Sequence, residues 1–426
     1  MVYGTADRSL PAGRSRGLTL ANVEFALVQL AVLFAPFQAF RPPEILLTLS
    51  DVLFMAVLVL RVLAGTLPLR PLGPGMAVWV LGCAMLIGGI TMSSVLRGDP
   101  FRGLIVGIQY GFAYLVLPFA LLARPYDQMV KLVRMGVWSM VAICGVGLFM
   151  YFTGVEFGDA TTPQLDAVSG SGRLTSLVGD ANTLSGMIGL TLPALAYSVG
   201  KKSLPRWFGA VLILFFLYSV ILTSSNTGLL VFMTALVILA IGRLEIATFV
   251  KTAFAGLLVV GLLVQFAEFI LPGVFLRRVG PALSSGDLTQ AGTFQGRWEL
   301  MVEAFRMLPD NLLVGMGADV FRTVSEHKAP VHNLYLLLGV EGGLVTICGW
   351  MVILLGGLVA ALGAGRRPDR GLDFLVVFST TGVFAVLAAT FPHMYARFLI
   401  VPLLLAISPS VALRSAVPTA RRHASP

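Results

Sequence analysis

Long apolar runs, most of about 18 residues or more, recur along the whole chain and are separated by short polar segments. A helix of that length spans roughly 30 Å of hydrocarbon. Because no water is present there to satisfy backbone N–H and C=O groups, each run must form a helix. The pattern predicts an all-α polytopic membrane protein with about twelve transmembrane helices. The approximate limits of these helices are 18–40, 44–63, 75–95, 103–123, 128–152, 174–199, 207–223, 228–242, 248–271, 331–362, 373–391 and 394–412.

Composition supports the membrane class. Of the 426 residues, 57% are hydrophobic and only 12% are charged, whereas a soluble domain carries about 25% charged residues. The first run, 18–40, is too long for the apolar part of a signal peptide and is interpreted as an uncleaved first span. Three cysteines, Cys83, Cys144 and Cys348, all fall in apolar runs without disulfide or metal-ligand spacing, so core packing is the better interpretation.

The net charge of +9 is unevenly distributed between the predicted loops. With the N-terminus inside, the inner segments hold about 19 of the Lys and Arg residues and the outer segments about 11. This asymmetry predicts that both termini are cytoplasmic. Because the positive charges flank the spans in this way, nucleic acid is not expected as a partner, and membrane lipids are.

Two outer loops divide the chain. The expected organisation is nine spans over 1–271 with an outer loop at 153–173, a large outer loop over 272–330, three spans over 331–412, and a basic cytoplasmic tail at 413–426. Within the large loop, apolar residues recur at near-helical spacing from 296 to 308, which predicts an amphipathic helix at the outer surface.

The most polar stretch outside the inner loops runs from Arg297 to Gly343. It contains arginines, glycines and a His332-Asn333 pair where the large loop meets the next span. Ionisable groups at such a boundary are candidates for a functional site. The alternatives are arginines that snorkel to lipid phosphates and a histidine that packs against Tyr335.

Several motifs in this region resemble the bacterial O-antigen ligase and polymerase superfamily. The motifs are Arg297-Trp298-Glu299, Pro309, Gly315-Met316-Gly317, Phe321, His332-Asn333-Leu334-Tyr335-Leu336 and Glu341-Gly342-Gly343, preceded by Gly172-Arg173-Leu174-Thr175-Ser176-Leu177 and Asp180-Ala181-Asn182-Thr183-Leu184. The resemblance covers roughly residues 165 to 360 at motif level. Many spans with one large outer loop before the last three also fit this superfamily.

The resemblance implies a GT-C-like membrane enzyme. Such an enzyme is an inverting, metal-independent glycosyltransferase that uses glycans linked to undecaprenyl pyrophosphate. The acceptor would be another lipid-linked glycan or lipid A core. The enzyme would lie in the inner membrane with its site facing the periplasm. It would need no cofactor. A flippase and a chain-length regulator are implied as partners.

The chemistry of the residues agrees with this implication. A pyrophosphate leaving group needs charge neutralisation, and arginine forks bind phosphate oxygens in a bidentate manner, so Arg173 and Arg297 are the candidate pyrophosphate ligands. The acceptor hydroxyl needs a base, and His332 is the candidate. No metal-ligand cluster or paired carboxylates are apparent in the sequence.

Supporting roles are expected for a further set of residues. Asp180 and Asn182 would line the cavity, and Gly315 and Gly317 would let the loop backbone approach the sugar. Glu341 would either orient its partners or bond to a neighbouring helix. Asn333 and Tyr335, which follow His332 closely in the chain, are also expected to support the site.

Two alternatives remain. The glycine pattern after the His-Asn pair is incomplete, because Thr346 stands three residues after Gly343. This favours a polymerase of O-antigen or exopolysaccharide over a ligase to lipid A core. Asn226 also stands where many members have an arginine. The competing class is a polysaccharide or lipid transporter, but a transporter would carry polar groups near the bilayer midplane, whereas here they cluster at the outer boundary.

Overall fold

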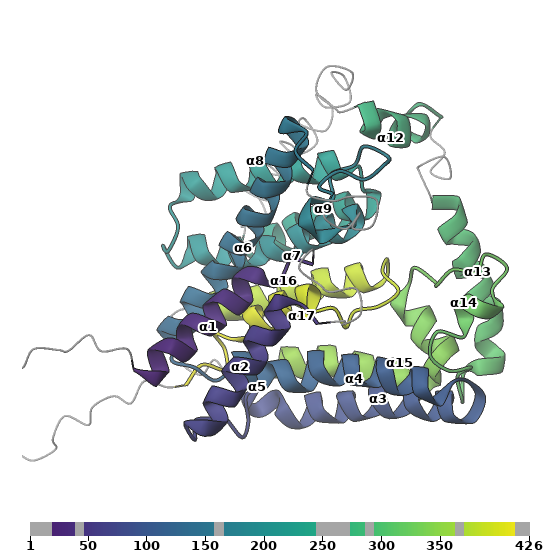
Figure 1. The fold of residues 1–426 in the computed structure, drawn as a ribbon, viewed down its shortest axis with the longest axis horizontal. Helices are drawn as coiled ribbons and strands as arrows, with labels where there is room; N and C mark the ends of the chain where they lie inside the picture. Colours follow the sequence, from purple (N-terminus) through teal and green to yellow (C-terminus); the bar gives the residue numbers. More distant parts are fainter. Residues whose placement is uncertain are drawn as a thin grey trace, which may run out of the picture.

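The computed structural model describes residues 19–38, 47–156, 166–243, 273–285, 294–362 and 370–413, and every named element in these ranges is a helix. Figure 1 shows their arrangement. The elements are α1 Leu20–Phe34, α2 Leu49–Leu63, η1 Gly73–Gly75, α3 Met76–Arg97, α4 Pro100–Gly111, η2 Phe112–Val116, α5 Leu117–Leu121, α6 Tyr126–Thr153, η4 Ser176–Val178, α7 Ala181–Gly200, α8 Arg206–Thr223, α9 Asn226–Arg243, α12 Gly273–Ser285, α13 Phe294–Asn311, α14 Phe321–Val324, α15 Leu334–Ala361, α16 Arg370–Ala388 and α17 Arg397–Ile407.

The prediction of an all-α polytopic membrane protein is confirmed. Seven helical segments in the described part of the chain are long and apolar enough to cross a membrane, and three further apolar helices are shorter. Eleven of the twelve predicted spans coincide with helices, while the span predicted at 248–271 lies outside the described residues. The count of twelve therefore stays a prediction.

Helix α7 lies at the centre of the bundle. It contacts α6, α8, α9, α16 and α17, and most of its side chains are buried. Its N-terminus is capped by Asp180, whose carboxylate accepts a hydrogen bond from the Thr183 amide at 2.7 Å. This cap satisfies a backbone donor that would otherwise be unpaired at the helix start.

Helices α3 and α15 form the closest helix pair, and glycines make the contact. A Cβ atom on Gly75 would lie 2.5 Å from the Gly356 carbonyl oxygen, and one on Gly82 would lie 2.8 Å from that of Gly349. The partner numbers fall as the α3 numbers rise, so the two helices run antiparallel. Small residues let helix backbones approach this closely, and in a membrane such packing is a main source of helix association.

Helix α15 is kinked at Gly343, and the loop after α13 completes the hydrogen bonding there. Gly343 has φ of 75°, which interrupts the helix. The carbonyl oxygens of Val340 and Glu341 instead accept hydrogen bonds from the amides of Met316 and Gly317, both at 2.9 Å. The kink therefore does not leave these backbone groups unpaired within the bundle.

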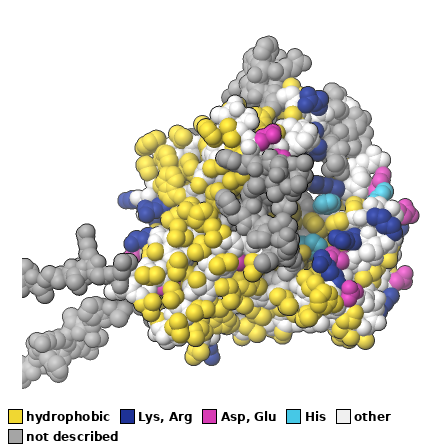
Figure 2. Space-filling model, in the orientation of Figure 1, with side chains coloured by type: hydrophobic (Ala, Val, Ile, Leu, Met, Phe, Trp, Pro, Cys, Tyr) yellow, Lys and Arg dark blue, Asp and Glu magenta, His cyan; other side chains and the backbone are white. Residues whose placement is uncertain are grey.

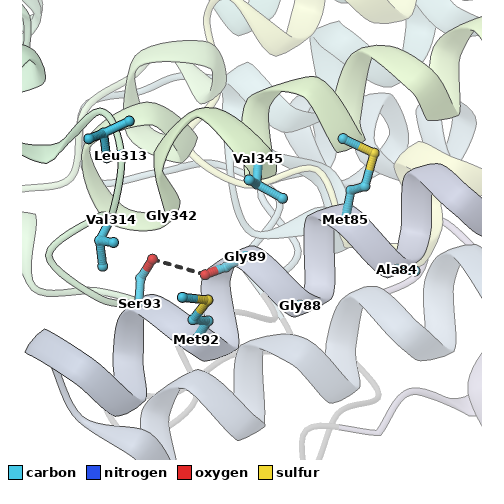
Figure 3. Close-up of a pocket in the computed structure, with 10 residues that line it drawn as sticks. All are labelled: Ala84, Met85, Gly88, Gly89, Met92, Ser93, Leu313, Val314, Gly342 and Val345. Carbon is cyan, nitrogen blue, oxygen red and sulfur yellow. Dashed lines mark hydrogen bonds between the residues drawn. The ribbon is translucent and has the colours of Figure 1, made fainter.

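The same loop lies across α3 (Figure 3). A Cβ atom on Gly315 would lie 2.2 Å from the Glu341 carbonyl carbon, and the Gly315 amide donates to the Ser93 hydroxyl at 3.2 Å. Together with α3 and α15, Leu313 and Val314 line an apolar groove of about 390 Å³. The absence of a side chain at Gly315 thus lets the loop backbone pack closely against the backbone of α15.

Helix α13 occupies the segment predicted to be amphipathic. Its buried residues include Leu300 and Ala304, which join a small core with Phe321 of α14. Trp298 and Phe305 are exposed instead. The apolar residues of this helix are thus divided between the core beneath it and its outer surface.

Charged side chains gather at the two ends of the bundle, with a hydrophobic belt between them (Figure 2). At one end, Glu24 pairs with Arg61 and Arg124, and Lys201 pairs with Asp373. Helix α7 and the continuous helical segment from α4 to α5 run the length of the bundle from this end to the opposite end. We call the opposite end the site end. The site end carries Arg102, Arg173, Arg297, Asp319 and His332.

The glycine contact between α3 and α15 predicts a stability difference between two neighbouring glycines. We expect Gly82→Ala to lower the free energy of unfolding by about 1–3 kcal/mol, because its methyl group would overlap the α15 backbone. Gly88→Ala, where a Cβ atom meets nothing within 4 Å, should be neutral or slightly stabilising. Thermal unfolding of both variants in detergent measures this, and equal melting temperatures would contradict the close packing.

Candidate functional site

Arg173 is fixed between two helix ends at the site end. Its Nε donates to the Thr223 carbonyl at 2.8 Å, and its Nη2 donates to Asn182 Oδ1 at 2.9 Å. The same Asn182 oxygen also accepts from the Ser225 hydroxyl at 2.8 Å. These bonds use two of the five guanidinium N–H donors within the described residues, so the fork is positioned and keeps donors for a ligand.

Arg297 lies in the first turn of α13 and lines an open cavity of about 400 Å³. Its Nη1 donates to the Thr227 hydroxyl of α9 at 3.2 Å. The cavity is also lined by Gly296, Leu300, His327 and His332. A cationic group and two imidazoles therefore share one accessible cavity.

His332 stands two residues before α15 and contributes a neutral imidazole. Burial, and after it the positive charge of Arg297, lower its pKa from the usual 6.5 to about 4, while Asp180 acts in the opposite direction. The imidazole is therefore uncharged at neutral pH. A neutral imidazole can accept a proton.

The arginines repel one another and are only partly neutralised. Burial lowers the pKa of Arg173 and that of Arg297, and the charge of Arg278 on α12 lowers both as well. Asp180 opposes these effects at both arginines. Three arginines facing one carboxylate leave a net positive field, which suits an anionic ligand.

The other predicted site residues have structural contacts in the described part of the chain. Asn333 caps α15 by accepting from the Leu336 amide at 3.2 Å. The Tyr335 hydroxyl donates to the Ala385 carbonyl of α16 at 2.9 Å. Asn182 holds Arg173, as described above, so each of these residues stabilises an element or a side chain of the site end.

Glu341 is buried in α15 and binds a neighbouring element. Its Oε1 accepts from the Phe321 amide of α14 at 3.3 Å, which agrees with the second of its two predicted roles. Gly315 and Gly317 contact α15 and α3. All three therefore hold the loop that carries α14 against the bundle.

Arg278 and His393 are among the groups at the site end that were not selected from the sequence. The charge of Arg278 acts on both site arginines. His393 lies 3.6 Å from Asp319, and its charge acts on His332. No sequence motif marks either residue. Among the described residues, no group of three or more His, Cys, Asp or Glu side chains is arranged to hold a metal ion.

The fold and the site together define a multi-pass membrane protein with a cationic, histidine-containing cavity at one end of its helices. Residues 210–351 match a family model described as O-antigen ligase. This segment contains Arg297 and His332, while Arg173 and Asp180 precede it. The match confirms the resemblance to the O-antigen ligase and polymerase superfamily that the motifs indicate, over this part of the chain. No curated protein matches the chain.

The electrostatics predict how His332 titrates. Diethyl pyrocarbonate modifies only neutral imidazole, so modification of His332 should persist as the pH falls below 6.5 and be half-lost near pH 4. In Arg297→Gln the midpoint should move to higher pH, because a positive charge that disfavours the imidazolium is removed. Mass spectrometry of the peptide containing His332 measures the midpoint. A midpoint near 6.5 in the unmodified protein would contradict the buried, cation-flanked environment.

Proposed function

We propose that this protein is a membrane glycosyltransferase that joins glycan units carried on undecaprenyl pyrophosphate to a hydroxyl acceptor. The match of residues 210–351 to the O-antigen ligase family model supports an activity of the glycosyltransferase type. The observation that carries the finer proposal is the convergence of Arg173, Arg297 and the neutral His332 at one end of the bundle. These are the residue types that a pyrophosphate donor and a hydroxyl acceptor need.

In this proposal the two arginines bind the donor. Arg173 and Arg297 grip the pyrophosphate oxygens, and Arg278 adds positive charge beside them. As the bond between the anomeric carbon and the pyrophosphate oxygen breaks, both bonding electrons leave with that oxygen. The arginines stabilise the developing negative charge, so no general acid is required.

His332 acts on the acceptor. Its neutral imidazole takes the hydroxyl proton as the acceptor oxygen attacks the anomeric carbon from the face opposite the pyrophosphate. One displacement of this kind inverts the configuration at that carbon. The pyrophosphate also partly neutralises Arg297 when it binds, and this raises the pKa of His332 from its low resting value. The base becomes stronger when the donor is in place.

Polymerisation of O-antigen or exopolysaccharide is the activity we favour, with ligation to lipid A core as the alternative. Thr346 stands at the position where the ligase-type pattern has glycine. In the fold its hydroxyl donates to the Gly342 carbonyl at 2.6 Å, and its side chain faces Gly89 of α3. We place the protein in the bacterial inner membrane with the site end toward the periplasm, on the strength of the Lys and Arg asymmetry. A flippase and a chain-length regulator are the expected partners.

The role of His332 predicts that His332→Ala abolishes long glycan without reducing the amount of protein in the membrane. Loss of a general base typically lowers the rate by about 10²–10⁴-fold. Polysaccharide on gels, from cells that make the variant at the native level, measures the effect. His423→Ala, in the C-terminal tail, is the matched histidine substitution and should make normal polymer. Near-normal glycan from His332→Ala would eliminate the proposed base.

The anion site predicts that lysine cannot replace either arginine. Arg173→Lys and Arg297→Lys keep the charge but lose the bidentate fork, so kcat/KM for the lipid-linked donor should fall roughly ten- to a hundredfold. Arg306→Lys, which changes an exposed arginine on the same helix as Arg297, is the control and should retain activity. Full activity of both site variants in a membrane assay would show that these arginines do not bind pyrophosphate.

A further inference from the structure

A second polar pair lies beside His332, on the loops that precede α14 and α17. Asp319 Oδ2 accepts from the Arg102 guanidinium of α4. The other carboxylate oxygen, Oδ1, faces His393 Nε2 at 3.6 Å. The Asp319 side chain is 10% exposed and that of His393 is 24% exposed, so neither side chain is fully enclosed.

At 3.6 Å the two groups attract each other and His393 helps to keep the Asp319 pKa low, but the distance is longer than an ordinary direct hydrogen bond. It suits a bridging group that donates to the carboxylate and accepts from the imidazole. A hydroxyl has both capacities, and it can lie about 2.8 Å from each atom at the apex of a triangle. A phosphate oxygen cannot donate to Asp319 and would be repelled by its charge.

Both members of the pair are held in place. The His393 ring stacks on Tyr395 with centroids 5.1 Å apart, and the Tyr114 hydroxyl donates to the Met394 carbonyl at 2.6 Å. Asp319 has φ of 60°, a left-handed conformation that is unfavourable for a non-glycine residue. Its neighbour Ala318 is fixed by a hydrogen bond that the Ala318 amide donates to the Ser94 hydroxyl at 2.9 Å. Strain that the surroundings hold in this way is typical of functional positions.

The pair differs from the arginine cluster in its charge balance. Arg278 and Arg297 act on Arg173, Arg278 acts on Arg297, and Arg297 acts on His332. Asp319 is the carboxylate whose charge is balanced locally by Arg102 and His393. His393 in turn acts on His332. His332 is therefore under the influence of Arg297, from the cationic region suited to phosphate, and of His393, from the carboxylate–imidazole pair suited to a neutral hydroxyl.

We propose that Asp319 and His393 bind the acceptor, with a sugar hydroxyl held between Asp319 Oδ1 and His393 Nε2. Arg102 occupies the other carboxylate oxygen and orients it. This inference rests on the proposed function and adds an acceptor subsite to it. The pair positions a saccharide hydroxyl, and His332 remains the group that takes the proton.

The test separates saccharide binding from pyrophosphate binding in the full-length protein in nanodiscs. The saccharide probe is the repeat oligosaccharide released from its lipid by mild acid, and the anion probe is inorganic pyrophosphate. His393→Phe keeps a ring to stack on Tyr395 and leaves the Arg102 pair intact, but it lacks the nitrogen. We expect this variant to weaken saccharide binding at least tenfold, measured by saturation-transfer NMR, with the pyrophosphate Kd unchanged within twofold and the melting temperature retained.

Companion variants complete the design. His393→Gln, which restores an N–H donor, should recover part of the saccharide affinity, and Asp319→Asn should lose it. Arg297→Lys should show the reverse selectivity and weaken pyrophosphate alone. Unchanged saccharide binding in His393→Phe, equal loss of both ligands, or no saccharide binding by the unmodified protein would overturn the subsite. Each of these outcomes is independent of glycan synthesis by His332→Ala, which tests the proposed function itself.

Discussion

The hydrogen bonds between the kinked helix α15 and the loop after α13 determine where the site residues lie. Gly343 interrupts α15 inside an apolar bundle, where an unpaired carbonyl is costly. The amides of Met316 and Gly317 satisfy the carbonyls before the kink. This fixes the loop whose preceding helix carries Arg297 and whose continuation leads to His332. A change that straightened α15 would therefore displace the cavity without touching any residue that lines it.

A second constraint is the incomplete neutralisation of charge at the site end. Asp180 is both the cap of α7 and the carboxylate that acts on Arg173, Arg297 and His332. Its single charge does not offset the arginines around it. At the other end of the bundle, Arg61 and Arg124 share Glu24 and also donate to backbone carbonyls. There the guanidiniums are occupied by the protein itself, whereas at the site end Arg297 lines an accessible cavity.

The sequence predicted the features that depend on local pattern. Apolar length located the spans, and near-helical spacing located α13. The order of motifs selected Arg173, Asp180 and Asn182, which the fold brings together. The helix cap formed by Asn333 could also be predicted from the sequence, since asparagine before a long apolar run is a helix-start signal.

The features that were missed depend on contacts between distant segments. Arg102 and Asp319 are 217 residues apart in the chain, and neither stands in a motif that points to the other. Gly315 and Gly317 look like glycines that make room for a ligand, but the backbone of α15 and α3 fills the space beside them. A glycine motif indicates that another group lies close to the backbone, but it does not indicate whether that group is a ligand or another helix of the protein.

Under the proposed mechanism, the low pKa of His332 limits when the site can react. Burial and Arg297 keep the imidazole neutral but weakly basic in the resting protein. Any water or hydroxyl that enters before the donor therefore meets a poor base. Bound pyrophosphate offsets Arg297, raises the pKa toward the range where imidazole is an effective base, and supplies the leaving group at the same time. The arginines thus couple donor binding to activation of the acceptor, so that the base gains strength only when a productive reaction is available.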